Sequence, residues 1–182
     1  MYSNQKRDMN LNKENIYKLE SVEDIKRFLV GGKAIMTLES KRTGKWFTYR
    51  IKKAKKDDNS PFFVSVLTGM DNDSAYTYMG TIFKNENKLN FKLTKASKIK
   101  EDALSYKAFI FFFNLLLNNS LHEEISIYHR GVCGRCGRTL TVPESLITGF
   151  GPECRGLTTK SLSSVRKQKL QIINSRNLKL SK

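Results

Sequence analysis

The chain has 182 residues, with 33 Lys and Arg against 17 Asp and Glu, which gives a formal net charge of +16. This length allows one domain with its own core and an appendage, and the charge favours polyanionic partners such as DNA, RNA or an anionic membrane surface. A lysine-rich composition also accompanies AT-rich genomes, so charge alone does not identify the partner. The longest apolar run, over residues 108–117, is shorter than the ~18–20 residues that span a bilayer. Residues 1–10 are polar and unlike a secretory signal. We therefore expect a cytoplasmic protein that does not act on a membrane.

The N-terminal quarter predicts an arm followed by a helix. Residues 1–20 are polar and of mixed charge, and we interpret them as an arm. Ser21 can cap a helix, and acidic residues at positions 23 and 24 favour its first turn. Val22, Ile25, Phe28 and Leu29 recur at helical spacing and form one apolar face. The Gly-Gly pair at 31–32 ends this helix.

The middle of the chain predicts a sheet and a second helix. Turn residues separate five strand-like segments, at 34–40, 46–52, 62–67, 75–83 and 89–94. Short turns between successive strands favour an antiparallel meander. Residues 101–118 are apolar almost all round at helical spacing, which is typical of a buried helix. The predicted fold class is α+β, with an antiparallel sheet of about five strands packed on a buried helix and a C-terminal zinc-binding module.

The zinc prediction depends on the three cysteines, which all lie between residues 129 and 154. Cys133 and Cys136 form a Cys-x2-Cys turn, whose spacing lets two thiolates share one tetrahedral zinc ion. Cys154 is the remaining thiol, and we predict His129 as the fourth ligand, with His122 or an exogenous ligand as alternatives. A closed shell of four ligands is typical of structural zinc, so we expect no catalytic role for the metal.

Two other interpretations of these cysteines remain open. Unpaired cysteine is commonly buried for packing alone. A disulfide is less favoured, because three cysteines leave one unpaired and no segment indicates an oxidising compartment. Within the module, Pro143 can begin a short helix over 144–148 that ends at Gly149.

The same segment resembles an uncharacterised family found mostly in bacteriophage genomes. Its C-terminal module has the form Cys-x2-Cys-Gly-Arg-x-Leu, then Ser, then Gly-x-Gly-Pro-x-Cys. The matching positions are Cys133, Cys136, Gly137, Arg138, Leu140, Ser145, Gly149, Gly151, Pro152 and Cys154. The resemblance implies a zinc ion, a phage origin and hence the host cytoplasm, but it implies no activity.

Two basic regions are candidates for contacting nucleic acid. Residues 41–56 are rich in Lys and Arg, contain no acidic residue and are interleaved with aromatic residues. Residues 155–182 also lack acidic residues, and we interpret them either as a basic amphipathic helix or as a solvated tail. The candidate nucleic-acid contacts are Lys41, Arg42, Lys45, Trp46, Arg50, Lys52, Lys53, Arg130, Arg135, Arg138, Arg166, Lys167 and Lys169.

Aromatic residues on a strand beside lysines can stack against single-stranded bases. Strand alternation leaves two arrangements open for residues 46–51. Either Phe47, Tyr49 and Ile51 belong to the core while Trp46, Thr48 and Arg50 face outward, or the reverse holds. The alternative to a stacking surface is that the rings belong to the core and the lysines form a solvated face.

We predict four segments, an arm at 1–20, an α+β domain at 21–122, a zinc module at 123–156 and a basic tail at 157–182. The favoured function is a small non-enzymatic zinc-binding protein that contacts nucleic acid. A factor that docks on a host or viral nucleoprotein complex is the alternative. A metal-dependent nuclease using Asp71 and Asp73 is less favoured, because a turn explains these residues more simply.

Overall fold

A computed structural model describes residues 17–55, 60–85 and 88–156. The chain divides into two compact units, residues 1–150 and 151–182, and each is treated by itself. Most of the predicted N-terminal arm and all of the predicted basic tail, including Arg166, Lys167 and Lys169, lie outside the described residues.

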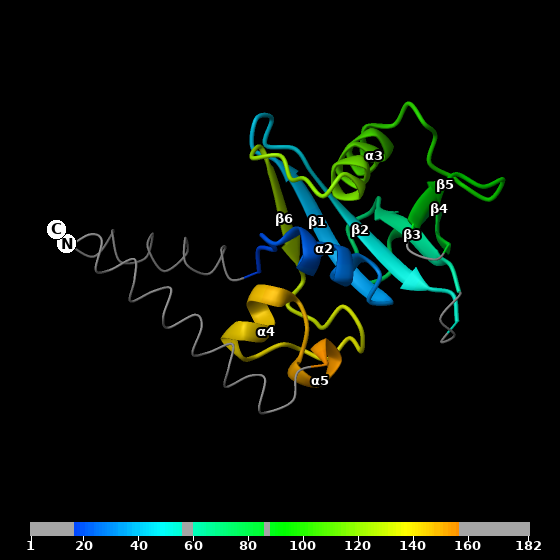
Figure 1. The fold of residues 1–182 in the computed structure, drawn as a ribbon. Helices are drawn as coiled ribbons and strands as arrows, with labels where there is room; N and C mark the ends of the chain where they lie inside the picture. Colours follow the sequence, from blue (N-terminus) through cyan, green and yellow to red (C-terminus); the bar gives the residue numbers. More distant parts are fainter. Residues whose placement is uncertain (1–16, 56–59, 86–87, 157–182) are drawn as a thin grey trace. The chain divides into compact units, whose positions relative to one another are not determined.

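An antiparallel sheet forms the framework of the first unit (Figure 1). Its strands are β1 (Lys33–Ser40), β2 (Trp46–Lys53), β3 (Phe62–Leu67), β4 (Tyr76–Asn85), β5 (Lys88–Lys92) and β6 (Ile125–His129). The strand order is β5-β4-β3-β2-β1-β6, so the first five strands form the predicted meander. The sheet has six strands where we predicted about five, because β6 pairs with β1, with Leu38 opposite Ile127.

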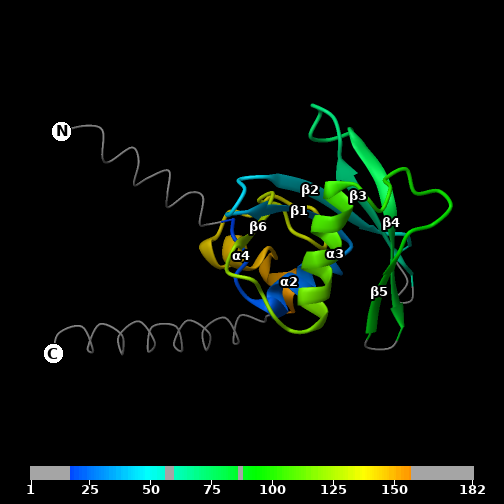
Figure 2. The same ribbon diagram turned by 90° about the horizontal axis from the view of Figure 1, so that it is seen from above.

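One face of the sheet carries the core. Ala34, Met36 and Leu38 alternate along β1 as buried residues, and Tyr49 and Ile51 continue this face on β2. Two helices, α2 (Val22–Leu29) and α3 (Leu104–Leu117), lie on this side of β1 and β2 in both views (Figures 1 and 2). We call this side the helix-covered face.

The helix α2 forms as the sequence predicts. The Ser21 side chain accepts a hydrogen bond from the Asp24 backbone amide at 3.4 Å, which satisfies one free amide of the first turn. Ile25, Phe28 and Leu29 are fully buried, in agreement with the predicted apolar face. The Phe28 ring lies 5.7 Å from the His129 ring of β6, so α2 packs over that edge of the sheet.

The helix α3 packs over the centre of the sheet. The Tyr49 ring lies 5.1 Å from Phe109, and the Tyr49 hydroxyl donates a hydrogen bond to the Ser105 carbonyl at 2.7 Å. Burial raises the pKa of Tyr49 and keeps this donor protonated. The prediction of a helix buried all round is only partly met, since Leu104 and Phe111 are 58% and 51% exposed.

The second unit is described only over residues 151–156. It contains the short helix α5 (Pro152–Arg155), with proline at its first position and Gly156 at its C-cap with φ of +74°. None of the helices in the described part of the chain has the length and apolar character needed to cross a membrane.

Candidate metal centre and basic sheet face

The Cys133–Cys136 turn closes through its own backbone. The Gly137 amide donates to the Cys133 carbonyl at 2.9 Å, and the Cys133 amide donates to the Arg138 carbonyl at 2.8 Å. Gly137 adopts φ of +79°, a left-handed conformation that glycine accepts at little cost. The two thiols therefore lie at the ends of one tight turn.

This turn is held against the first unit at Gly134. The Gly134 carbonyl accepts from the Lys33 amide at 2.7 Å, and its amide donates to the Gly149 carbonyl at 3.0 Å. A Cβ atom at Gly134 would lie 2.7 Å from the Phe28 ring, so this close approach requires glycine. The Lys33 ammonium also donates to the Cys136 carbonyl at 3.1 Å. The start of β1 and the helix α2 thus position the turn.

The thiol groups of Cys133, Cys136 and Cys154 form a candidate metal site. Their sulfur atoms all lie within 4.8 Å of one another, and the three cysteines are not joined by disulfides. Cys133 is buried and Cys136 is exposed, while Cys154 on α5 is intermediate. Three thiolates are soft ligands that suit zinc, and the spacing is compact enough for one ion.

Both ring nitrogens of His129, the predicted fourth ligand, form hydrogen bonds. The Gly131 amide donates to its Nδ1 at 3.0 Å, so Nε2 carries the proton and donates to the Leu146 carbonyl at 2.5 Å. Burial lowers the pKa of His129, which favours this neutral form. The geometry therefore places His129 among its hydrogen-bond partners and outside the group of three cysteines, and its assignment as the fourth ligand stays a prediction. The ring instead packs between Tyr17 and Phe28, at 5.6 and 5.7 Å.

The short helix of the module agrees with prediction. Helix α4 (Pro143–Thr148) has proline in its first turn and Gly149 at its C-cap with φ of +74°. A Cβ atom at Gly149 would lie 2.5 Å from the Phe28 ring. Phe28 therefore touches both backbone segments that hold the cysteine turn, Gly134 and Gly149.

The sheet alternation resolves the two arrangements that the sequence left open. Tyr49 and Ile51 are buried on the helix-covered face, so Thr48, Arg50 and Lys52 point to the other side. We call that side the open face. Its positions, taken from the strand register, include Lys33, Ile35, Thr37, Glu39, Trp46, Thr48, Arg50, Lys52, Phe63, Ser65, Leu67, Tyr76, Tyr78, Thr81, Lys92 and Tyr128.

The predicted basic cluster at 41–53 is divided by this geometry. Trp46, which is 66% exposed, shares the open face with Arg50 and Lys52. Lys53 lies instead on the helix-covered side, with its ammonium 5.8 Å from the Phe62 ring.

Other predicted basic residues lie in turns. Lys41, Arg42 and Lys45 lie in the turn between β1 and β2, where Arg42 is 3.9 Å from the Glu124 carboxylate. Arg135 and Arg138 are exposed on the cysteine turn.

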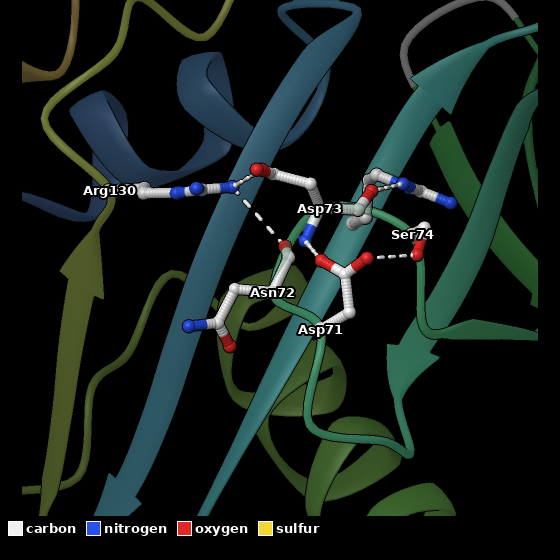
Figure 3. Close-up of polar contacts among 6 residues, drawn as sticks. Asp71, Asn72, Asp73, Ser74 and Arg130 are labelled. Carbon is white, nitrogen blue, oxygen red and sulfur yellow. Dashed lines mark hydrogen bonds and ion pairs between the residues drawn. The ribbon is translucent and has the colours of Figure 1, made fainter.

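Arg130, which follows β6, contacts the loop between β3 and β4. Its guanidinium donates to the Asp73 carboxylate at 2.6 Å and to the Asn72 carbonyl at 3.2 Å (Figure 3). This hydrogen bond to Asp73 raises the pKa of Arg130. Arg50 reaches the same loop, donating to the Asp73 carbonyl at 3.0 Å while it stacks 4.1 Å above the Tyr76 ring.

Asp71 and Asp73, the two carboxylates considered for a nuclease, form hydrogen bonds within this loop and to Arg130. Asp71 accepts from the Asp73 amide at 2.8 Å and from the Ser74 hydroxyl, and these bonds lower its pKa (Figure 3). Asp73 points instead to Arg130. Because the two carboxylates have separate partners, this geometry does not favour the nuclease hypothesis.

Sequence analysis did not include Lys33, Phe63 and Lys92 among the candidate contacts of the open face. The register places Lys33 opposite Lys52, and Lys52 opposite Phe63. Thr81 lies opposite both Phe63 and Lys92. Phe63 is 45% exposed, whereas its neighbour Phe62 is 2% exposed. Alternation within each strand was visible in the sequence, but the register that aligns these residues in one row was not.

The comparison with protein families finds a similarity for a short segment of the chain. A family model described as "Family of unknown function (DUF6011)" matches residues 126–157, which include β6 and all three cysteines. The match covers a short part of the chain, so it is a similarity of this segment alone. No curated protein and no solved structure matches the chain. Nothing in these comparisons indicates an enzyme.

Proposed function

We propose that this is a small non-enzymatic zinc-binding protein that contacts nucleic acid through basic surfaces. The phage origin and the cytoplasmic location implied by the sequence belong to this proposal. The zinc part and the nucleic-acid part have separate support and separate tests.

The three-thiol group supports the zinc part. A short module has little core of its own, and metal binding free energy can replace it. The Lys33 ammonium beside the Cys136 carbonyl adds positive charge next to a cluster that is anionic when its thiols are deprotonated. Three cysteines leave one position of a tetrahedral zinc ion for a fourth donor, for which His129 stays the predicted ligand.

Metal analysis of the purified chain tests this part. We expect roughly one zinc ion per chain in the wild type and a large loss in Cys154→Ser and Cys136→Ser. His122→Ala is the matched control, because the exposed His122 was the alternative histidine ligand and lies outside the cysteine group. Unchanged zinc content and unchanged melting in Cys154→Ser would contradict the assignment.

The open face is the single observation that carries the nucleic-acid part. Its strands present Lys33, Arg50, Lys52 and Lys92, and Arg130 follows directly after β6. Lys33 and Lys52 are opposite each other and both exposed, and like charges in a cross-strand pair repel. Cations grouped on one face are the usual electrostatic signature of a nucleic-acid-binding surface.

Salt-dependent binding of labelled oligonucleotides tests this part. We expect affinity to fall steeply between about 50 and 200 mM salt, because each phosphate contact releases counterions. Deleting residues 157–182 measures the separate contribution of the predicted basic tail. Absence of binding at the lowest salt would overturn the proposal and leave the charge as a property of composition.

A pocket beside α3 favours the second candidate, a factor that docks on a nucleoprotein complex. This pocket of about 560 Å³ lies between α3 and the β1–β2 turn, and Leu38, Phe47 and Phe112 line it. Leu104 and Phe111 also line the pocket, and both are exposed large apolar residues. Capture of a specific protein that survives nuclease treatment and is lost in Phe111→Ser would favour this candidate.

A further inference from the structure

The loop between β3 and β4 presents an acidic group to the cations of the open face. Residues 68–75, which we call the Asp73 loop, connect the end of β3 to the start of β4. The loop is held at its base, where the Thr68 amide donates to the Ala75 carbonyl at 2.9 Å. Its tip reaches Arg130, which follows the strand at the opposite edge, β6 (Figure 3).

Two arginines of the open face converge on Asp73. Arg130 binds its carboxylate at 2.6 Å, and Arg50 binds its carbonyl at 3.0 Å. The register pairs His129 with Met36 and Ile35 with Arg50, so the position after His129 continues the row that holds Ile35 and Arg50. Asp73 therefore occupies a place where two guanidinium groups can hold one anionic group.

The contact with Asp73 is suited to exchange. The Asp73 side chain is 79% exposed and the Arg130 side chain is 42% exposed. Ion pairs this accessible to water contribute little to stability, so a stronger anion can replace the carboxylate at small cost. Arginine also binds phosphate with good geometry, through two parallel N–H groups.

Exposed aromatic rings lie on the same face as these cations. Phe63 is 45% exposed and Trp46 is 66% exposed, whereas their neighbours Phe62 and Phe47 point to the helix-covered side. The Phe63 ring is supported edge-on by Tyr78, with ring centroids 6.1 Å apart. Aromatic rings beside cations stack on unpaired bases, which a duplex keeps inside its own stack.

We propose that the open face binds single-stranded nucleic acid, and that the Asp73 carboxylate occupies Arg130 until a backbone phosphate of the strand replaces it. This inference rests on the proposed function and deepens it, because it names the class of nucleic acid and an internal competitor. In the bound state Arg50 and Arg130 face phosphates, while Phe63 and Trp46 stack on bases. Free protein keeps the arginine site closed by its own acidic group.

Asp73→Asn is the critical variant. It removes the competing charge but keeps a polar side chain of the same size, and the backbone carbonyls that accept from Arg130 and Arg50 remain. Glu23→Gln is the matched control. It also removes one negative charge, but from α2, which lies on the helix-covered side. Thermal melting of each full-length variant confirms that it is folded.

The experiment measures fluorescence anisotropy of labelled oligothymidylate, oligouridylate and a duplex DNA of equal length. We expect the wild type to prefer the single strands. Asp73→Asn should bind them roughly three- to tenfold more tightly at low salt, with a salt slope steeper by about one phosphate contact. Glu23→Gln should show a smaller gain without a change in slope. Adding Arg130→Gln to Asp73→Asn should remove the gain.

The outcomes separate this inference from the proposed function. Salt-dependent binding in which Asp73→Asn gains no more than Glu23→Gln would overturn the competitor while leaving the proposed function intact. Equal or tighter binding of the duplex would overturn the single-strand assignment. No binding to any of the three ligands would overturn the proposed function itself. A preference between oligothymidylate and oligouridylate distinguishes DNA from RNA as the source of the strand.

Discussion

The two faces of one sheet differ in almost every property that matters for function. On the helix-covered face, Met36, Tyr49 and Ile51 are fully buried beneath α2 and α3. On the open face, the alternating neighbours include Arg50 and Lys52, together with the exposed Trp46. Successive residues of a strand point to opposite sides, so the same eight residues of β2 serve both the core and the surface.

Because of this difference between the two faces, substitutions on one face should affect stability and substitutions on the other should affect binding. Removal of a buried ring leaves a cavity and costs several kcal/mol, whereas exposed substitutions usually change stability by less than about 0.5 kcal/mol. Variants on the helix-covered face should therefore lower the melting temperature. Variants on the open face should change affinity at constant melting temperature.

The adjacent residues Phe62 and Phe63 give the sharpest test of this contrast. We expect Phe62→Ala to lower the free energy of unfolding by about 3–5 kcal/mol, because Phe62 is 2% exposed in the core. Phe63→Ala should cost far less stability but remove ~1–3 kcal/mol of single-strand binding free energy. Urea denaturation and anisotropy measure the two quantities. Equal losses of stability in the two variants would refute the division into faces.

The variant His129→Ala distinguishes two interpretations of this residue, a buried structural residue and a metal ligand. We expect His129→Ala to lower the free energy of unfolding by about 2–4 kcal/mol, because it leaves the buried Gly131 amide without its acceptor and opens a cavity. Zinc content of the folded variant should remain at the wild-type level. Loss of zinc under conditions where circular dichroism shows a folded chain would restore His129 as the fourth ligand.

Alanine substitutions at Gly149 and Gly44, taken together, measure the contribution of packing against Phe28. Both have positive φ, +74° and +64°, but a Cβ atom would meet the Phe28 ring at 2.5 Å only at Gly149. Alanine at either position strains the backbone by a similar amount. We expect Gly149→Ala to cost about 1–3 kcal/mol more than Gly44→Ala, from the added clash. Equal melting temperatures would mean that the cysteine module is not packed on α2 as described.

Lys52→Ala has the smallest expected effect on stability. Its exposed side chain lies opposite Lys33, so removing it should change the free energy of unfolding by less than about 0.5 kcal/mol. The slope of log affinity against log salt concentration for single-strand binding should become shallower by about 1, which corresponds to one lost phosphate contact. Lys107→Ala on α3 is the control, because it removes the same charge from the helix-covered side and should leave the slope unchanged. An equal change of slope in both variants would indicate binding without a defined face.

Much of the fold follows from local patterns in the sequence. The Ser21 cap, the apolar face of α2, five of the strands and the Pro143–Gly149 helix each depend on residues close together in the chain. The Cys-x2-Cys spacing likewise predicts that Cys133 and Cys136 share one site, and their sulfur atoms do lie together. Short-range rules of capping, alternation and turn chemistry are sufficient for such features.

The remaining features depend on contacts between distant residues. Pairing of β6 with β1 and the contact of Arg130 with Asp73 join segments that share no local signal. The contact of His129 with Leu146 is of the same kind, since Leu146 lies in a later helix. The Gly131 amide and the Leu146 carbonyl of α4 are the partners of its two ring nitrogens, and its assignment as the fourth zinc ligand stays a prediction.

The location of bound nucleic acid tests the central claim most directly. We would cross-link a labelled single strand to the full-length protein with ultraviolet light and identify the modified peptides by mass spectrometry. The two-face account predicts adducts in peptides that contain Trp46 or Phe63, reduced when unlabelled strand competes. Adducts confined to α2 and α3, on the helix-covered side, would contradict it.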